Sequence, residues 1–343
     1  MGQAAMLQEP MPRQPVAGTV RCTACEHWCR IAPGEAGRCG VRANVGGSLE
    51  LLVRGRAAAL AVDPVEKKPL FHFLPGRPIL SIGTLGCNLR CRFCQNWDIS
   101  QERPGLAGAH LGRDLPPEAI VELCVVRDIP MIAFTYNEPV VALEYAYDTF
   151  VLAKERGIRT VFVSSGFETL RALDVIEPVL DAINVDLKAF TDRFYRELSG
   201  ARLKPVLRNI AHIARETPIW IEVTTLLVPG QNDSSREIGE AADFLASVSP
   251  DLPWHLTAFH PDYLMLDTPP TPLRMLVRAR EIGKRAGLRH VYVGNMRDPK
   301  RESTWCPSCG AMLVARSGYR TEVATREPGT CDRCGVRVPG VWG

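Results

Sequence analysis

The residues with the clearest chemistry are three cysteines in the stretch SIGTLGCNLRCRFCQNWDIS, residues 81–100. Cys87, Cys91 and Cys94 have the spacing C-x3-C-x2-C, and no fourth cysteine lies close to them in the sequence. Three thiolates on one short loop can hold three irons of a [4Fe-4S] cluster, whose usual complement is four cysteines. The fourth iron is then open to a nitrogen and oxygen ligand, such as the amino and carboxylate groups of S-adenosylmethionine. The alternatives are free thiols or a zinc knot, although zinc sites usually have four ligands in C-x2-C pairs.

Two further groups of cysteines flank this loop, and grouped cysteines in an intracellular chain favour metal sites over disulfides. The last group consists of two C-x2-C pairs, each followed by glycine, which is typical of a structural zinc ribbon: Cys306, Cys309, Cys331 and Cys334. The first group has the spacing C-x2-C-x3-C-x9-C: Cys22, Cys25, Cys29 and Cys39. This spacing fits zinc or an auxiliary iron-sulfur cluster. Zinc is slightly favoured, because four cysteines are enough for a closed tetrahedral site. Cys124 stands alone among apolar residues, which indicates a core position.

The elements that must position these thiols are strands and helices in alternation. Short apolar runs are separated by longer amphipathic ones, which predicts βα units and a parallel sheet. The candidate strands are ILSI at 79, MIAF at 131, TVFV at 160, INVDL at 183, IWIEV at 219, WHLTAF at 254 and VYV at 291. About six βα units indicate an α/β fold of the partial (β/α)6 TIM-type barrel class. The cysteine loop follows the first strand, at the carboxyl end where such barrels build active sites.

Composition divides the chain into four parts. We expect a flexible lead at 1–18, a cysteine-rich metal-binding segment at 19–76, the barrel at 77–298 and the zinc ribbon at 299–343. The formal charge of +3 requires neither a nucleic acid nor a membrane surface as partner, and the ribbon lacks a dense basic and aromatic surface. No apolar run approaches the roughly 20 residues of a spanning helix, and the N-terminus has no hydrophobic signal core. These features predict a cytoplasmic protein.

Phe93 and the three loop cysteines resemble the radical S-adenosylmethionine enzymes. The strings CQNWDIS, FTYNEP, NVDLKAF, PWHLTAFHPDY and VYVGN resemble enzymes similar to the pyruvate formate-lyase activating enzyme. The segments CTACEHWCRIAPGEAGRCGVR and CDRCGVRVPGVW resemble the radical SAM enzyme of the AmmeMemoRadiSam system, over nearly the whole chain. The resemblance implies reductive cleavage of S-adenosylmethionine to a 5'-deoxyadenosyl radical that abstracts hydrogen from an unidentified substrate. It also implies an electron donor such as flavodoxin or ferredoxin, and Memo-like and AMMECR-like partner proteins.

The resemblance also assigns cofactor-binding positions at the strand ends: Asn137, Glu138, Ser164, Ser165, Asp186, Lys188 and His260. Glu138 is implied to hold the methionine amine and Lys188 the methionine carboxylate, while Asp186 orders the site or a bound cation. Each has a simpler interpretation, because Glu138 can be a helix N-terminal acid and His260 a structural histidine. Asp186 and Lys188 can be a solvated ion pair. Tyr-Asn-Glu at 136–138 stands where many relatives have Gly-Gly-Glu, so the backbone near the cofactor is expected to differ.

Two other functions stay open at this point. One is an activating enzyme that installs a glycyl radical on a partner protein, and the other is a non-catalytic zinc protein that binds nucleic acid or other proteins. The three-cysteine loop and TYNEP disfavour the second alternative. The terminal ribbon disfavours the first, because the simple activating enzymes that this chain resembles end near the barrel.

Overall fold

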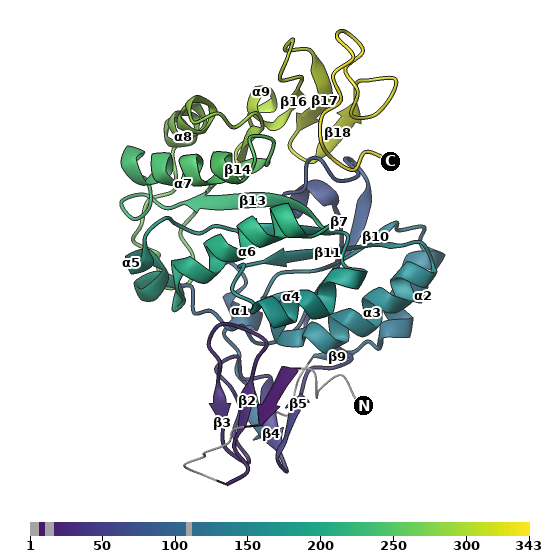
Figure 1. Cartoon of the computed structure of the whole chain (residues 1–343), viewed down its shortest axis with the longest axis vertical. Coiled ribbons are helices and arrows are strands. Elements are labelled where there is room, and N and C mark those ends of the chain that lie inside the picture. The colour runs from purple at the N-terminus through teal and green to yellow at the C-terminus, as the bar shows by residue number, and fades with distance from the viewer. Residues whose placement is uncertain (1–6, 11–16, 108–111) are drawn as a thin grey trace.

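The computed structural model describes residues 7–10, 17–107 and 112–343, and its centre is an eight-stranded sheet (Figure 1). The strand order is β15-β14-β13-β12-β11-β10-β8-β7, and every neighbouring pair from β8 to β15 is parallel. The sheet is open because its edge strands, β7 and β15, do not pair with each other in the described chain. Its strands are β7 (Ala59–Pro64), β8 (Pro78–Gly83), β10 (Met131–Phe134), β11 (Arg159–Ser164), β12 (Ala182–Asp186), β13 (Trp220–Leu227), β14 (Trp254–Ala258) and β15 (Val291–Gly294). The predicted partial barrel is therefore confirmed.

A helix lies between each pair of successive parallel strands and covers the outer face of the sheet (Figure 1). These helices are α2 (Pro117–Val126), α3 (Leu143–Glu155), α4 (Leu170–Ile176), α6 (Leu203–Glu216), α7 (Ser235–Val248) and α8 (Leu273–Arg285). Helix α7 shows why they form where they do. Ser234 caps it by accepting a hydrogen bond from the Glu237 N–H, and Ile238, Ala242 and Leu245 are buried on one face at helical spacing. The shorter helices are α1 (Trp97–Ser100), α5 (Asp192–Phe194), a π-helix at Tyr195–Ser199 and α9 (Pro299–Glu302).

The N-terminal region forms small antiparallel sheets at one end of the barrel. Its strands are β1 (Gln8–Pro10), β2 (Val20–Cys22), β3 (Arg30–Ile31), β4 (Arg42–Val45) and β5 (Ser48–Leu51), while β6 (Arg56–Ala57) pairs with β9 (Arg113–Asp114). Strand β1 differs from the flexible lead expected at 1–18. It is ordered because Leu7 is buried at 1% exposure and the Gln8 side chain bonds to the backbone of Gly47 and Leu49. Residues 1–6 and 11–16 of that lead lie outside the described residues.

The C-terminal region contains β16 (Thr304–Trp305), β17 (Met312–Ser317) and β18 (Arg320–Val323), and it docks on the barrel through buried polar contacts. The fully buried Arg316 guanidinium donates to the Phe71 carbonyl at 2.7 Å and contacts Glu66 at 3.5 Å. His72 Nδ1 lies 2.9 Å from the Pro339 carbonyl. None of the helices in the described part of the chain has the length and apolar character that crossing a bilayer requires.

Candidate active site

The three cysteines of the C-x3-C-x2-C motif lie on the loop between β8 and α1, at the carboxyl end of the parallel strands. The Cys87 sulfur accepts a hydrogen bond from the Leu89 N–H at 3.4 Å, and the Cys94 sulfur lies 3.1 Å from the Ser100 hydroxyl. Burial raises the pKa of Cys91 to about 11 and that of Cys87 well above its usual value. Iron ligation deprotonates such thiols and offsets this cost. Three clustered sulfurs with nearby donors therefore fit an iron-sulfur cluster.

Asn137 holds the first part of this loop in place. Its side-chain oxygen accepts from the Thr84 N–H at 3.2 Å, and its amide donates to the Thr84 hydroxyl at 3.0 Å and to the Gly86 carbonyl at 2.6 Å. These three bonds occupy the amide, so in this structure Asn137 positions the loop that carries Cys87.

Tyr136 adopts a backbone conformation that is unusual for a residue other than glycine. Its φ of 71° lies in the left-handed region that normally favours glycine. The Tyr136 hydroxyl bonds to Asp63 at 3.1 Å, and the Lys68 ammonium lies 4.9 Å from the ring centroid. Asn96 donates to the Tyr136 carbonyl at 2.9 Å. These contacts stabilise a backbone conformation that costs about 1 kcal/mol or more.

Glu138 is buried at 3% exposure and is surrounded by the two predicted serines. Its carboxylate accepts from the Ser164 hydroxyl at 2.9 Å, the Ser165 hydroxyl at 2.5 Å and the Ser165 N–H at 2.8 Å. The same Ser164 hydroxyl lies 3.0 Å from the carboxylate of Glu168, which is 4% exposed. Burial and the neighbouring Glu138 raise the pKa of Glu168 to about 8. A cation such as an ammonium group would favour the ionised forms of these two buried carboxyl groups, which share one hydroxyl.

We expect the stability of wild type relative to Glu168→Gln to fall as the pH rises from about 4.5 to about 8. In the folded protein Glu168 keeps its proton up to the higher value, whereas in the unfolded chain it ionises near 4.5, so the folded state binds more protons across this window. The expected slope is on the order of 1 kcal/mol per pH unit. Anaerobic Tm measurements of both proteins at several pH values test this. A Tm difference that is constant with pH would contradict the assignment.

Lys188 and Asp186 form an ion pair beside the cysteine loop, with Nζ and Oδ2 separated by 2.9 Å. The Lys188 ammonium also lies 5.9 Å from the centroid of the Phe93 ring. Burial lowers the pKa of Lys188, but the Asp186 carboxylate and the Cys91 thiolate outweigh this and leave it above its usual value. Lys188 is therefore a permanent cation next to the loop, and its side chain is only 13% exposed.

His260 reaches the loop through Gln95, with 2.8 Å between the Gln95 Nε2 and His260 Nε2 atoms. Both line a cleft that extends to the C-terminal region, where Gly318 and Tyr319 form its far side. His255, deeper in the same cleft, bonds to the buried Glu222 at 2.6 Å and belongs to the core. The cleft therefore extends from Gln95, which directly follows Cys94, to the C-terminal region.

Sequence reasoning missed Glu168 and Gln95. Gln95 directly follows Cys94, and Glu168 lies four residues beyond Ser164, where the chain turns from β11 toward α4. An acidic residue just after a strand end was the only available signal for Glu168, because its partner Glu138 comes from another strand end.

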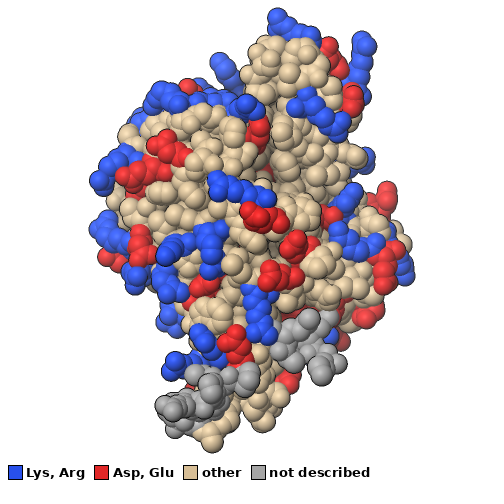
Figure 2. Space-filling view, in the orientation of Figure 1, with Lys and Arg blue, Asp and Glu red and all other residues tan. Residues whose placement is uncertain are grey.

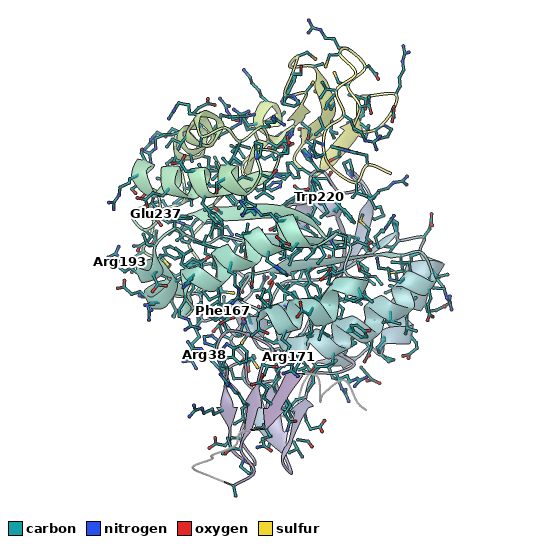
Figure 3. All side chains as sticks on the ribbon, in the orientation of Figure 1. Arg38, Phe167, Arg171, Arg193, Trp220 and Glu237 are labelled. Carbon is teal, nitrogen blue, oxygen red and sulfur yellow. The ribbon has the colours of Figure 1, made fainter. Side chains whose placement is uncertain are left out.

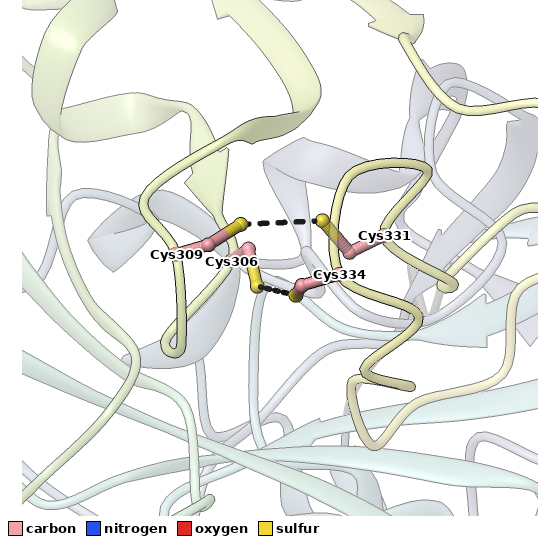
Figure 4. A group of neighbouring side chains, drawn as sticks. All are labelled: Cys306, Cys309, Cys331 and Cys334. Carbon is pink, nitrogen blue, oxygen red and sulfur yellow. Dashed lines mark hydrogen bonds between the residues drawn. The ribbon is translucent and has the colours of Figure 1, made fainter.

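The four C-terminal cysteines form a compact group (Figure 4). The Cys306 and Cys334 sulfurs lie 3.5 Å apart, as do those of Cys309 and Cys331. All four sulfurs lie within 4.8 Å of one another, which suits a single tetrahedral metal ion.

The four N-terminal cysteines line one common cavity: Cys22, Cys25, Cys29 and Cys39. The structure thus brings each of the three cysteine groups together. The lone Cys124 is buried in the core at 1% exposure, as predicted.

Comparisons with known proteins agree with this geometry. Residues 81–245 match the family described as the Radical SAM superfamily. An uncharacterized protein of Methanocaldococcus jannaschii is 40% identical over 325 residues, which cover 93% of this chain and 95% of that protein. The pyruvate formate-lyase-activating enzyme of Listeria monocytogenes is 27% identical over 176 residues, which cover 48% of this chain and 67% of that enzyme.

Among solved structures, Streptococcus suis SuiB bound to S-adenosylmethionine has the same fold, with a TM-score of 0.51 and 14% identity. The match covers 71% of this chain and 56% of SuiB. The partial barrel, the cysteine loop at the carboxyl end of its strands and these similarities show that the chain belongs to the radical SAM superfamily, has homology to pyruvate formate-lyase-activating enzymes and is a radical SAM enzyme.

Proposed function

We propose that this enzyme cleaves S-adenosylmethionine reductively and uses the 5'-deoxyadenosyl radical to take a hydrogen atom from a substrate in an AmmeMemoRadiSam-type system. Cys87, Cys91 and Cys94 hold a [4Fe-4S] cluster, which supplies the electron that splits the sulfonium into methionine and the radical. The observation that carries this proposal is the three-cysteine loop at the carboxyl end of the barrel, beside two buried carboxylates and a buried ammonium.

Different residues around the loop bind different groups of S-adenosylmethionine. Glu138, with Ser164 and Ser165 fixing its carboxylate, faces the methionine ammonium, and Lys188, oriented by Asp186, faces the methionine carboxylate. His260 and Gln95 border the substrate side of the site, because both line the open cleft.

We expect Glu138→Gln and Lys188→Met each to weaken S-adenosylmethionine binding about tenfold or more, because charge-assisted contacts are worth roughly 1.5 to 3 kcal/mol each. Iron content should stay near wild type, since neither side chain is a cluster ligand in this proposal. Anaerobic titration calorimetry measures the affinity. Lys154→Met is a matched control, because Lys154 also pairs with an aspartate, Asp181, at 2.6 Å but lies on the helical face of the sheet. Unchanged affinity in both site variants would place the cofactor elsewhere.

The partners follow from the same proposal. An electron donor such as flavodoxin or ferredoxin supplies the reducing electron, and Memo-like and AMMECR-like proteins act with the enzyme on the substrate. We also propose that the terminal ribbon holds zinc, supported by two C-x2-C pairs with sulfurs at single-ion distances. A cytoplasmic location suits a chain in which none of the twelve described cysteines forms a disulfide.

The experiment for this proposal measures 5'-deoxyadenosine in the presence of Memo-like and AMMECR-like proteins and an anaerobic extract of small molecules. We expect production to rise above the uncoupled rate only with the partner proteins present. Glycyl-radical activation is the second candidate, favoured by the similarity to activating enzymes over about half of the chain. Stimulation by a glycyl-radical enzyme, with a glycine-centred radical in its electron paramagnetic resonance (EPR) spectrum, would select this alternative instead.

A further inference from the structure

The N-terminal cysteines are arranged differently from the four cysteines of the ribbon. A zinc ion with Zn–S bonds of about 2.3 Å holds four sulfurs about 3.8 Å apart, which matches the C-terminal ribbon. Among the residues that the structure describes, only the ribbon gathers three or more metal-ligating side chains with all their ligand atoms within 4.8 Å of one another. Cys22, Cys25, Cys29 and Cys39 line one cavity, but no three of their sulfurs lie within 4.8 Å of one another. The three catalytic sulfurs likewise do not all lie within 4.8 Å of one another, and the family ligates an iron-sulfur cluster there.

The cavity also presents hydrogen-bond donors that have no partner within the described chain. They are the Arg38 Nε, the Arg42 Nε and the Asn88 Nδ2, and all three residues line the cavity. Arg42 is 2% exposed and fixed by Glu144, which accepts from its two terminal nitrogens at 2.7 and 2.5 Å and leaves the Nε unpaired. Arg38 lies where the N-terminal strands meet the barrel (Figure 3). Buried unpaired donors are costly, and cluster sulfides and thiolates are anionic acceptors that satisfy them.

This cavity shares a wall with the catalytic loop. Asn88 lines the cavity and directly follows the catalytic ligand Cys87, and its Oδ1 lies 3.8 Å from the Cys87 sulfur. The chain is packed closely here, because a Cβ added to Gly86 would meet the Cys39 carbonyl at 2.5 Å. The His27 Nε2 lies 2.8 Å from the Asn88 carbonyl, and this contact holds the Asn88 backbone in place.

From the sulfur spacing, the unpaired donors and the shared wall, we infer that Cys22, Cys25, Cys29 and Cys39 hold a second [4Fe-4S] cluster that passes electrons to the catalytic one. A cluster at this position differs from the zinc ion that the cysteine spacing in the sequence slightly favours. The transfer involves one electron at each step. A low-potential one-electron carrier protein is oxidised, the second cluster is reduced and then reoxidised, and the catalytic cluster is reduced.

The surface beside this group is basic, which suits an acidic carrier protein. Glu26, next to Cys25, lies in an open cleft that is also lined by Asp192 and by four cationic residues: Arg196, Arg202, Lys204 and Arg208. The three arginines form ion pairs with Glu26 or Asp192, and the cations still outnumber the two acids. Figure 2 shows Lys and Arg side chains, with some Asp and Glu among them, over α5 and α6, the elements around this cleft. Cys25 and Cys29 are themselves only partly buried. The proposed cluster therefore lies near this surface, where a docked carrier protein would transfer its electron.

Metal analysis of the anaerobically reconstituted full chain tests the inference. Wild type should contain about eight iron and eight sulfide per chain, with zinc only from the ribbon. Cys29→Ser should lose about half of the iron, whereas the matched control Cys124→Ser, at a buried cysteine outside all three groups, should keep it. With dithionite as reductant, S-adenosylmethionine cleavage by Cys29→Ser should fall less than about threefold, but with reduced flavodoxin it should fall at least about tenfold.

The wild-type measurement decides the question even if Cys29→Ser fails to fold. About four iron and two zinc per chain would overturn the second cluster. An equal loss of dithionite-driven and flavodoxin-driven cleavage in a folded Cys29→Ser protein would overturn the electron relay. In reduced wild type, EPR signals broadened by two neighbouring clusters are expected, and the signal of a single isolated cluster would contradict them.

Discussion

Cys91→Ala is expected to abolish S-adenosylmethionine cleavage completely and to remove the catalytic cluster. Three cysteines provide the protein ligands at this site, and Cys91 is the central one, 8% exposed and next to the Lys188 ammonium. Losing one of three thiolates leaves two irons without protein ligands. The measurements are iron content and 5'-deoxyadenosine formation after anaerobic reconstitution and reduction.

The matched control for Cys91→Ala is Cys124→Ala, which removes a buried thiol from the core. It should cost some stability through lost packing, by roughly 1 to 2 kcal/mol, but keep cluster and cleavage. Full cleavage activity in Cys91→Ala would mean that the loop is not the site of chemistry.

Replacing Cys331 and Cys334 by serine is expected to release the ribbon metal and unfold the C-terminal strands. Structural zinc sites contribute about 10 to 16 kcal/mol of binding energy, and the ribbon's own apolar cluster is small. Unfolding β17 would also remove the buried Arg316 from its contacts with Phe71 and Glu66. We expect iron content and uncoupled cleavage to stay largely intact, because the cysteine loop bonds to barrel elements. Turnover of the physiological substrate should fall, because Gly318 and Tyr319 line the cleft that reaches Gln95.

The paired measurement is zinc and iron content beside 5'-deoxyadenosine formation without substrate. Arg333→Ser is a suitable control, because Arg333 is exposed between the two mutated cysteines and is not a proposed metal ligand. Loss of the iron cluster together with zinc would show that the ribbon is needed for the catalytic fold.

The parallel sheet could be predicted because its strands are continuous apolar runs buried on both faces, as in MIAF at 131, where all four residues are buried. Strand β7 could not be predicted in the same way. It is an edge strand with two exposed residues, and only its pairing with β8 places it in the sheet. The strand at Gln8–Pro10 forms by antiparallel pairing with β2, and the Gln8 side chain also bonds to residues about 40 positions away, which local patterns do not reveal.

The metal-ligating cysteines could be predicted because they occur at characteristic sequence spacings, C-x3-C-x2-C in the catalytic loop and paired C-x2-C motifs in the ribbon. The placement of Asn137 against the loop and the sharing of Ser164 by Glu138 and Glu168 needed the structure, because both depend on how strand ends converge. The choice between zinc and a cluster at the first cysteine group likewise depends on sulfur separations, which a spacing of C-x2-C-x3-C-x9-C does not define.

The measurement that most directly tests the central claim is product analysis of the anaerobically reduced wild-type enzyme with S-adenosylmethionine. We expect 5'-deoxyadenosine and methionine to form in equal amounts, only when both the reductant and the iron-sulfur cluster are present. A protein that binds its full complement of iron, takes up the reducing electron and yet leaves S-adenosylmethionine intact would contradict the account.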